Sequence, residues 1–134
     1  MQGKTSNLTT LQEHINYDSI KIVLESMLAE DQNIRRIIID SLGMDSPEAP
    51  KYFQKMAEID SRNKRQLKEL LEKYGWIEKS KIGEKAAEGI FYVIQHSDLE
   101  TIKKYFPQFK KLAEIGEAST KLCAMMEDRM LMWE

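Results

Sequence analysis

Apolar residues recur at a spacing of three to four positions along most of this chain, which places them on one face of an α-helix. The first such stretch covers about residues 17–42 and ends at Gly43, because glycine adopts the left-handed conformation that commonly stops a helix. A second stretch covers about residues 50–74 and ends at Gly75. Trp76 follows directly, so we expect it to be buried against the last turn of that second helix.

The most apolar segment lies in the middle of the chain, at about residues 84–96. A loop through Ser80 and Gly83 leads into it. Because the segment leaves little polar surface, we expect it to be the central buried helix of the fold. Gly89 lies inside this helix and indicates that another helix approaches closely there, since glycine has no side chain to keep the backbones apart.

The last third of the chain begins with a predicted helix start and contains one proline. Ser97 and Glu100 have the spacing of a capping box, so a helix is expected to start at Asp98. Pro107 removes a backbone donor and clashes with the preceding turn, so it is expected to interrupt that helix, with a second short helix after it. A final helix is predicted at about residues 118–133.

The pattern as a whole predicts an all-α fold, because no strand-like alternation, internal repeat or low-complexity segment appears. We expect a single-domain bundle of about six helices around a buried central helix. A chain of 134 residues is long enough for one such domain. We assign this single helical domain to residues 17–134 and treat residues 1–16 as a polar N-terminal segment.

Composition and charge argue against several classes of function. The net charge is −2 and the two signs are interspersed, so nothing favours nucleic acid or anionic lipid. No stretch is apolar enough to cross a membrane, and the first ten residues lack the apolar run of a secretory signal. The single cysteine, Cys123, cannot form an intramolecular disulfide and fits a reducing compartment. We therefore expect a cytoplasmic protein that binds neither nucleic acid nor membrane.

Pairs of polar residues interrupt the apolar faces of four predicted helices. The pairs are Asp31 with Arg35, Asp60 with Asn63, Gln95 with His96, and Asp128 with Arg129. Burying a charged group is costly unless it is paired, so polar groups set into core-like helix faces are expected to meet one another. The alternative is that these are ordinary surface residues, with Asp31 and Arg35 forming an exposed ion pair.

Common metal and nucleophile motifs are missing from the sequence. Two histidines and one cysteine lack the ligand spacing of a zinc site, and no Glu-x-x-His pair of a di-iron bundle occurs. Glycine-rich phosphate loops and nucleophile elbows are also missing. We interpret Cys123 as a small core residue. The expectation is a protein without a metal or cofactor.

The same polar residues carry a resemblance to a known family. The succession comprises Asp31-Gln32 with Arg35, Asp60 with Asn63, Gly75-Trp76, Ser80 and Gly83, Gln95-His96, and Asp128-Arg129. It resembles an uncharacterised, mostly bacterial helical family, domain of unknown function 6624, from about Met27 to the C-terminus. The resemblance implies a helical domain whose signature residues are these polar pairs, and it adds Gln32 to the candidate site. It implies no particular reaction.

The chain departs from that family's pattern in two places. Ile77 stands where relatives usually have proline after the Gly-Trp pair. Relatives usually continue past the Asp-Arg helix into a tail that ends in a Tyr-Gly-Thr-Gln-like motif, whereas this chain stops at Glu134. If that tail closes the site in relatives, this protein is expected to bind without turnover or to use another element as a lid.

Two kinds of function fit these residues. The first is a metal-independent enzyme with His96 as general acid or base, oriented by Asp60 or Asp128. Arg35 and Arg129 would then hold an anionic group of a small ligand, because arginine suits carboxylate and phosphate recognition. The remaining ligand-binding residues of this hypothesis are Asp31, Gln32, Asn63 and Gln95.

The second is a non-catalytic interaction or structural module whose polar network only fixes helix packing, with a protein partner that the sequence does not identify. The two differ in the geometry they require around His96. An enzyme needs an open pocket beside the imidazole, whereas a structural network is closed and its hydrogen bonds are all satisfied.

Overall fold

The helices form close to the positions that the apolar pattern predicts. The computed structural model describes residues 15–133, and within that range it contains six α-helices, one π-helix and no strand. The elements are α2 (Tyr17–Arg36), η1 (Ile37–Leu42), α3 (Ala49–Tyr74), α4 (Lys79–Ile82), α5 (Glu84–Gln95), α6 (Leu99–Glu114) and α7 (Thr120–Met132). The predicted all-α fold is therefore confirmed. Most of the polar segment assigned to residues 1–16 lies outside the described residues.

Local capping explains where the two long helices begin and end. Asn16 caps α2, because its side-chain oxygen accepts a hydrogen bond from the backbone N–H of Ser19 at 3.0 Å. The predicted helix over residues 17–42 has the expected length, although its last six residues form the π-helix η1. Gly43 and Gly75 follow η1 and α3 with φ angles of 81° and 72°, a conformation that favours glycine.

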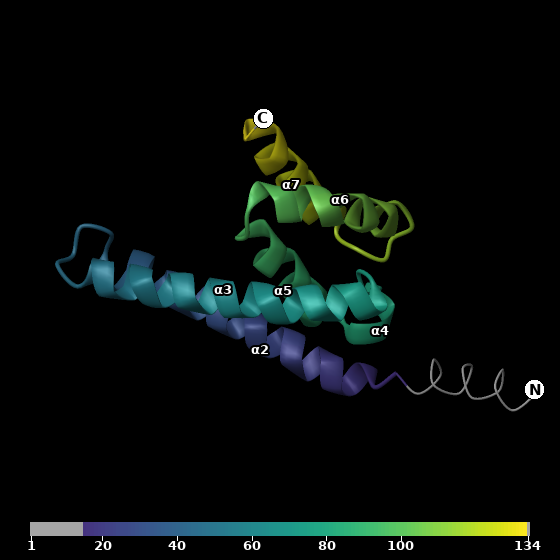
Figure 1. The fold of residues 1–134 in the computed structure, drawn as a ribbon, viewed down its shortest axis with the longest axis horizontal. Helices are drawn as coiled ribbons and strands as arrows, with labels where there is room; N and C mark the ends of the chain where they lie inside the picture. The colour runs from purple at the N-terminus through teal and green to yellow at the C-terminus, as the bar shows by residue number, and fades with distance from the viewer. Residues whose placement is uncertain (1–14, 134) are drawn as a thin grey trace, which may run out of the picture.

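Helix α5 occupies the centre of the fold, as the sequence predicts. It packs against α2, α3, α4 and α6. Figure 1 shows α2 and α3 as a long antiparallel pair, with α6 and α7 on the other side of α5. A Cβ atom built on Gly89 would lie 2.5 Å from the carbonyl oxygen of Leu24, so only glycine allows α2 to approach this closely.

Trp76 ties the end of α3 to α6. Its side chain is 6% exposed, which confirms the predicted burial. The indole ring stacks on Phe109 with ring centroids 4.3 Å apart, and the Trp76 backbone N–H donates to Gln108 Oε1 at 2.9 Å. The apolar contact made by this tryptophan thus reaches α6.

Helix α6 corrects two expectations. Asp98 is its N-cap and accepts hydrogen bonds from the backbone and hydroxyl of Thr101, whereas Ser97 donates to the carbonyl of Ile94 at the end of α5. The predicted interruption at Pro107 is wrong, because α6 continues through it. The proline is exposed, while buried apolar residues hold the opposite face of the helix before and after it. Their packing offsets the one backbone hydrogen bond that proline removes.

Candidate functional site

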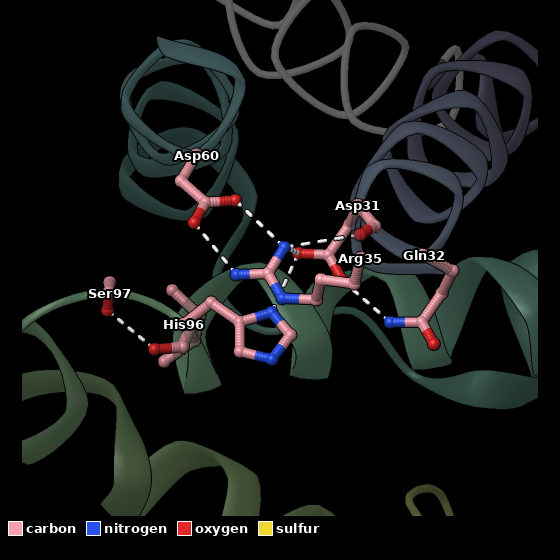
Figure 2. Close-up of polar contacts among 7 residues, drawn as sticks. Asp31, Gln32, Arg35, Asp60, His96 and Ser97 are labelled. Carbon is pink, nitrogen blue, oxygen red and sulfur yellow. Dashed lines mark hydrogen bonds and ion pairs between the residues drawn. The ribbon is translucent and has the colours of Figure 1, made fainter. Parts of the chain in front are cut away.

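The polar cluster is built around the carboxylate of Asp31 on α2, which is 1% exposed. This carboxylate accepts hydrogen bonds from Arg35 Nη1 at 3.1 Å and from Gln32 Nε2 at 2.7 Å, and its Oδ1 lies 2.7 Å from His96 Nδ1 (Figure 2). An ionised carboxylate can only accept hydrogen bonds, so His96 Nδ1 is the donor. The neutral imidazole therefore carries its proton on Nδ1 and its lone pair on Nε2.

Arg35 joins α2 to α3 through a two-pronged ion pair with Asp60. Its Nη1 and Nη2 donate to Asp60 Oδ1 at 3.1 Å and Oδ2 at 2.8 Å, as Figure 2 shows. The same Nη1 also reaches the carboxylate and the backbone carbonyl of Asp31. Such bidentate pairs fix geometry as well as charge. The guanidinium of Arg35 is consequently paired with two carboxylates, those of Asp31 and Asp60.

His96 is the C-cap residue of α5, and its side chain is 22% exposed. Its ring lies 5.9 Å from that of Tyr92, one turn earlier on the helix. Within residues 15–133 no hydrogen bond to Nε2 is found, whereas Nδ1 is held by a buried carboxylate. A histidine held in this way is positioned to exchange a proton through Nε2. The carboxylate that orients it is Asp31, whereas the sequence pattern favoured Asp60 or Asp128 for this role.

Two side-chain amides near this network have buried polar atoms without a hydrogen-bond partner among the described residues. Asn63 lies one turn after Asp60 on α3 and is 1% exposed, and neither Oδ1 nor Nδ2 has a hydrogen-bond partner among the described residues. The same holds for Oε1 of Gln95, which precedes His96. A buried amide left in this state costs about 1 to 3 kcal/mol. The hydrogen-bonding capacity of these atoms is therefore unused within the described part of the chain.

Arg129 differs from Arg35 because no carboxylate of residues 15–133 accompanies its charge. Its Nε is buried without a partner, and its guanidinium carbon lies 4.0 Å from the centroid of the Trp133 ring. Burial lowers the pKa of Arg129, and the positive charge of Arg35 lowers it further. Burial and a like charge act in the same direction, because both disfavour the charged form. Arg129 is thus a partly desolvated cation whose charge no carboxylate of residues 15–133 balances.

Asp128 does not join the cluster. Consecutive helical residues point about 100 degrees apart, so Asp128 and Arg129 face different directions. The structure leaves Arg129 half-buried and Asp128 exposed, so the expectation of an inward Asp128 is wrong. The residues that hydrogen bonds and ion pairs bring together are Asp31, Gln32, Arg35, Asp60 and His96.

Two cavities lie on either side of Tyr92. One, of about 720 Å³, lies between α2 and α5 and includes Gln32 in its lining. The other, of about 480 Å³, lies between α5 and α7 and has an aromatic wall that includes Trp76 and Phe91. Tyr92 lines both cavities, whereas His96 lines neither.

Among the described residues, no group of three or more histidine, cysteine, aspartate or glutamate side chains could hold a metal ion. None of the helices described is both long and apolar enough to span a membrane. Burial raises the pKa of the Cys123 thiol, which agrees with its interpretation as a core residue.

Comparison with known proteins places the polar pairs within a wider family. Residues 18–134 match the model of a family of unknown function. The match begins somewhat earlier than the resemblance seen in the sequence and includes every residue of the candidate site. None of the curated proteins and none of the solved structures compared with the chain matches it.

Proposed function

The chain belongs to the family of unknown function DUF6624, so its activity has to be argued from the site itself. We propose that this site binds a small anionic ligand beside His96, and that His96 acts on the ligand as general acid or base. We also place the protein in the cytoplasm, because the unpaired Cys123 suits a reducing compartment.

The observation that carries the proposal is the state of Arg129. It is a cation with no carboxylate partner in the described part of the chain, and the charge of Arg35 already disfavours it. An anion bound there would supply the missing negative charge. The unpartnered Nδ2 of Asn63 could donate a hydrogen bond to the same anion, as polar groups do in ligand pockets. A carboxylate or phosphate group would meet both of these needs, whereas Oδ1 of Asn63 and Oε1 of Gln95 are acceptors and call for a donor elsewhere on the ligand.

The catalytic part of the proposal rests on the bond between Asp31 and His96. The buried carboxylate holds Nδ1–H at 2.7 Å, so the lone pair of the neutral ring is on Nε2. That nitrogen can take a proton from a bound molecule and return it, and histidine performs this exchange near neutral pH. The arrangement supports proton transfer as the chemical step, without identifying the bond that is made or broken.

A purely structural role is the competing proposal, and two observations favour it. The first is that His96 lines neither of the two cavities described above, although an enzyme needs an open pocket beside it. The second is the network itself. Arg35 connects two carboxylates on α2 and α3, and Asp31 connects α2 to His96 at the end of α5. These contacts fix the packing of three helices and are expected to stabilise the fold whatever else the site does. The structural proposal leaves Arg129, Asn63 and Gln95 unexplained, because a network built only for packing would satisfy them.

Anion binding with a matched arginine variant tests the proposal. The probes are inorganic phosphate, sulfate and acetate, added to wild type, Arg129→Met and the control Arg65→Met, which replaces an exposed arginine on α3. We expect at least one anion to raise the Tm of wild type and of Arg65→Met, because a ligand stabilises the state that binds it. The same anion should shift the His96 ring resonances. The proposal fails if no anion stabilises wild type, or if Arg129→Met responds as wild type does.

A further inference from the structure

The cavity between α5 and α7 has a mainly apolar wall and a charged rim. The wall includes Trp76, Phe91, Phe109, Leu122 and Met125. Two lysines and two glutamates, Lys79, Lys121, Glu84 and Glu88, also line it, so the rim carries no formal net charge. At about 480 Å³ the cavity falls within the range that holds small molecules. It can therefore remove an apolar group of a ligand from water, but it does not select the sign of a charge.

Helical periodicity places residues of the polar site one turn beyond the lining of this cavity, on both α5 and α7. On α5 its lining runs from Glu84 to Tyr92, and residues three or four positions further along the same face are Gln95 and His96. On α7 its lining reaches Met125, and four positions further along is Arg129. Both walls of the cavity thus lead, within one turn, to the residues of the proposed anion site.

We propose that the ligand is amphipathic, with its anionic group at Arg129 and an apolar chain or ring in the cavity between α5 and α7. This inference rests on the proposed anion site, because Arg129 sets the sign of the charged group. The apolar wall adds the second requirement, since burying methylene groups strengthens binding in proportion to the area removed from water. A carboxylate or phosphate without an apolar part would fill only one end of the site.

A series of straight-chain carboxylates measures the apolar requirement directly. Kd is determined for butyrate, hexanoate and octanoate by calorimetry on wild type. Each methylene that enters the cavity is expected to strengthen binding about fourfold, so octanoate should bind roughly 250-fold more tightly than butyrate. The indole N–H resonance of Trp76, assigned with Trp133→Phe, should shift with octanoate because Trp76 lines the cavity.

A pair of alanine-to-phenylalanine variants shows where the chain binds. Ala87 lines the cavity, so the larger side chain of Ala87→Phe should fill it. In this variant the Kd of octanoate should be less than tenfold lower than the Kd of butyrate. Ala57 is exposed on α3, so Ala57→Phe should show the same dependence of Kd on chain length as wild type. If Ala87→Phe does not fold, Met125→Asp replaces it, because Met125 is partly exposed and an aspartate there would repel the chain and its carboxylate.

The outcomes separate this inference from the proposed function. If phosphate or acetate binds through Arg129 but Kd changes less than threefold from butyrate to octanoate, the anion site stands and the amphipathic ligand is refuted. A chain-length effect that Ala87→Phe leaves intact, with no shift at Trp76, also refutes it, because the chain then lies elsewhere. If octanoate binds Arg129→Met as tightly as wild type, both proposals fail together.

Discussion

His96 Nδ1 lies 2.7 Å from Asp31 Oδ1, although the two residues are 65 positions apart and belong to different helices. The carboxylate is buried and the imidazole is partly exposed. This contact therefore holds one nitrogen of the ring inside the protein and leaves the other as the group that a bound molecule can meet. The bond decides both the tautomer and the direction of any proton transfer.

Replacing Asp31 by leucine should release the tautomer of His96. Leucine offers no acceptor to Nδ1–H, so the ring proton is no longer held on Nδ1 and is expected to move at least in part to Nε2. ¹⁵N NMR of the imidazole reads this change, with the His96 signals assigned by their loss in His96→Gln. Asp60→Asn is the control, because Asp60 bonds to Arg35 and not to His96. Unchanged ring shifts in Asp31→Leu would show that the contact does not set the tautomer.

The two arginines should differ in their contribution to stability. Arg35→Met leaves the buried carboxylate of Asp31 and the paired carboxylate of Asp60 without their guanidinium, and should cost about 3 to 5 kcal/mol. Arg129→Met leaves no partner carboxylate in the described part of the chain and loses mainly its contact with Trp133, about 0.5 to 1 kcal/mol. Urea unfolding of both variants measures the difference. Equal losses of unfolding free energy in the two variants would show that Arg129 mainly stabilises the packing of the fold.

Trp76→Ala should destabilise the protein by about 3 to 5 kcal/mol, the usual range for truncating a buried large aromatic. The change removes the stack on Phe109 and leaves a hole between the end of α3 and α6. Trp133→Ala is the control, because this tryptophan is 42% exposed and should change stability by about 1 kcal/mol or less. An unaltered denaturant midpoint for Trp76→Ala would show that its burial does not stabilise the fold.

Stability should depend on pH through Asp98, the N-cap of α6. A hydrogen bond from Lys64 and a second from Thr101 hold the pKa of Asp98 well below its ordinary value. Because the pKa is lowered in the folded state, this stabilisation is present above about pH 4, the ordinary aspartate pKa, and is lost as the pH falls toward the folded value. The difference in unfolding free energy between wild type and Asp98→Asn should therefore shrink between pH 6 and pH 3.

Asp98→Ala separates the cap from the charge. Asparagine caps helices about as well as aspartate, whereas alanine cannot, so Asp98→Ala should lose about 1 kcal/mol more than Asp98→Asn. That additional loss should be similar at both pH values, since it does not involve titration. A gap between wild type and Asp98→Asn that stays constant from pH 6 to pH 3 would contradict the role of the charged pair.

The sequence by itself determined the helices and the candidate polar residues of this protein. Apolar spacing and the glycines at positions 43 and 75 placed the long helices, and the density of apolar residues identified α5 as the central one. These features are local, because they depend on which residues share a helix face and on what the backbone can adopt at its ends. The same local rules placed Asp31, Asp60 and His96 on faces that turn inward.

Only the tertiary structure decided which of those residues meet. Spacing gives the face of a helix but not its partner across the fold, so it could not choose Asp31 over Asp60 as the residue that holds His96. It could not show that Arg129 lacks a carboxylate while Arg35 contacts two, nor that packing carries α6 through Pro107. These outcomes depend on how helices distant in the sequence pack together, and a one-dimensional pattern does not contain that arrangement.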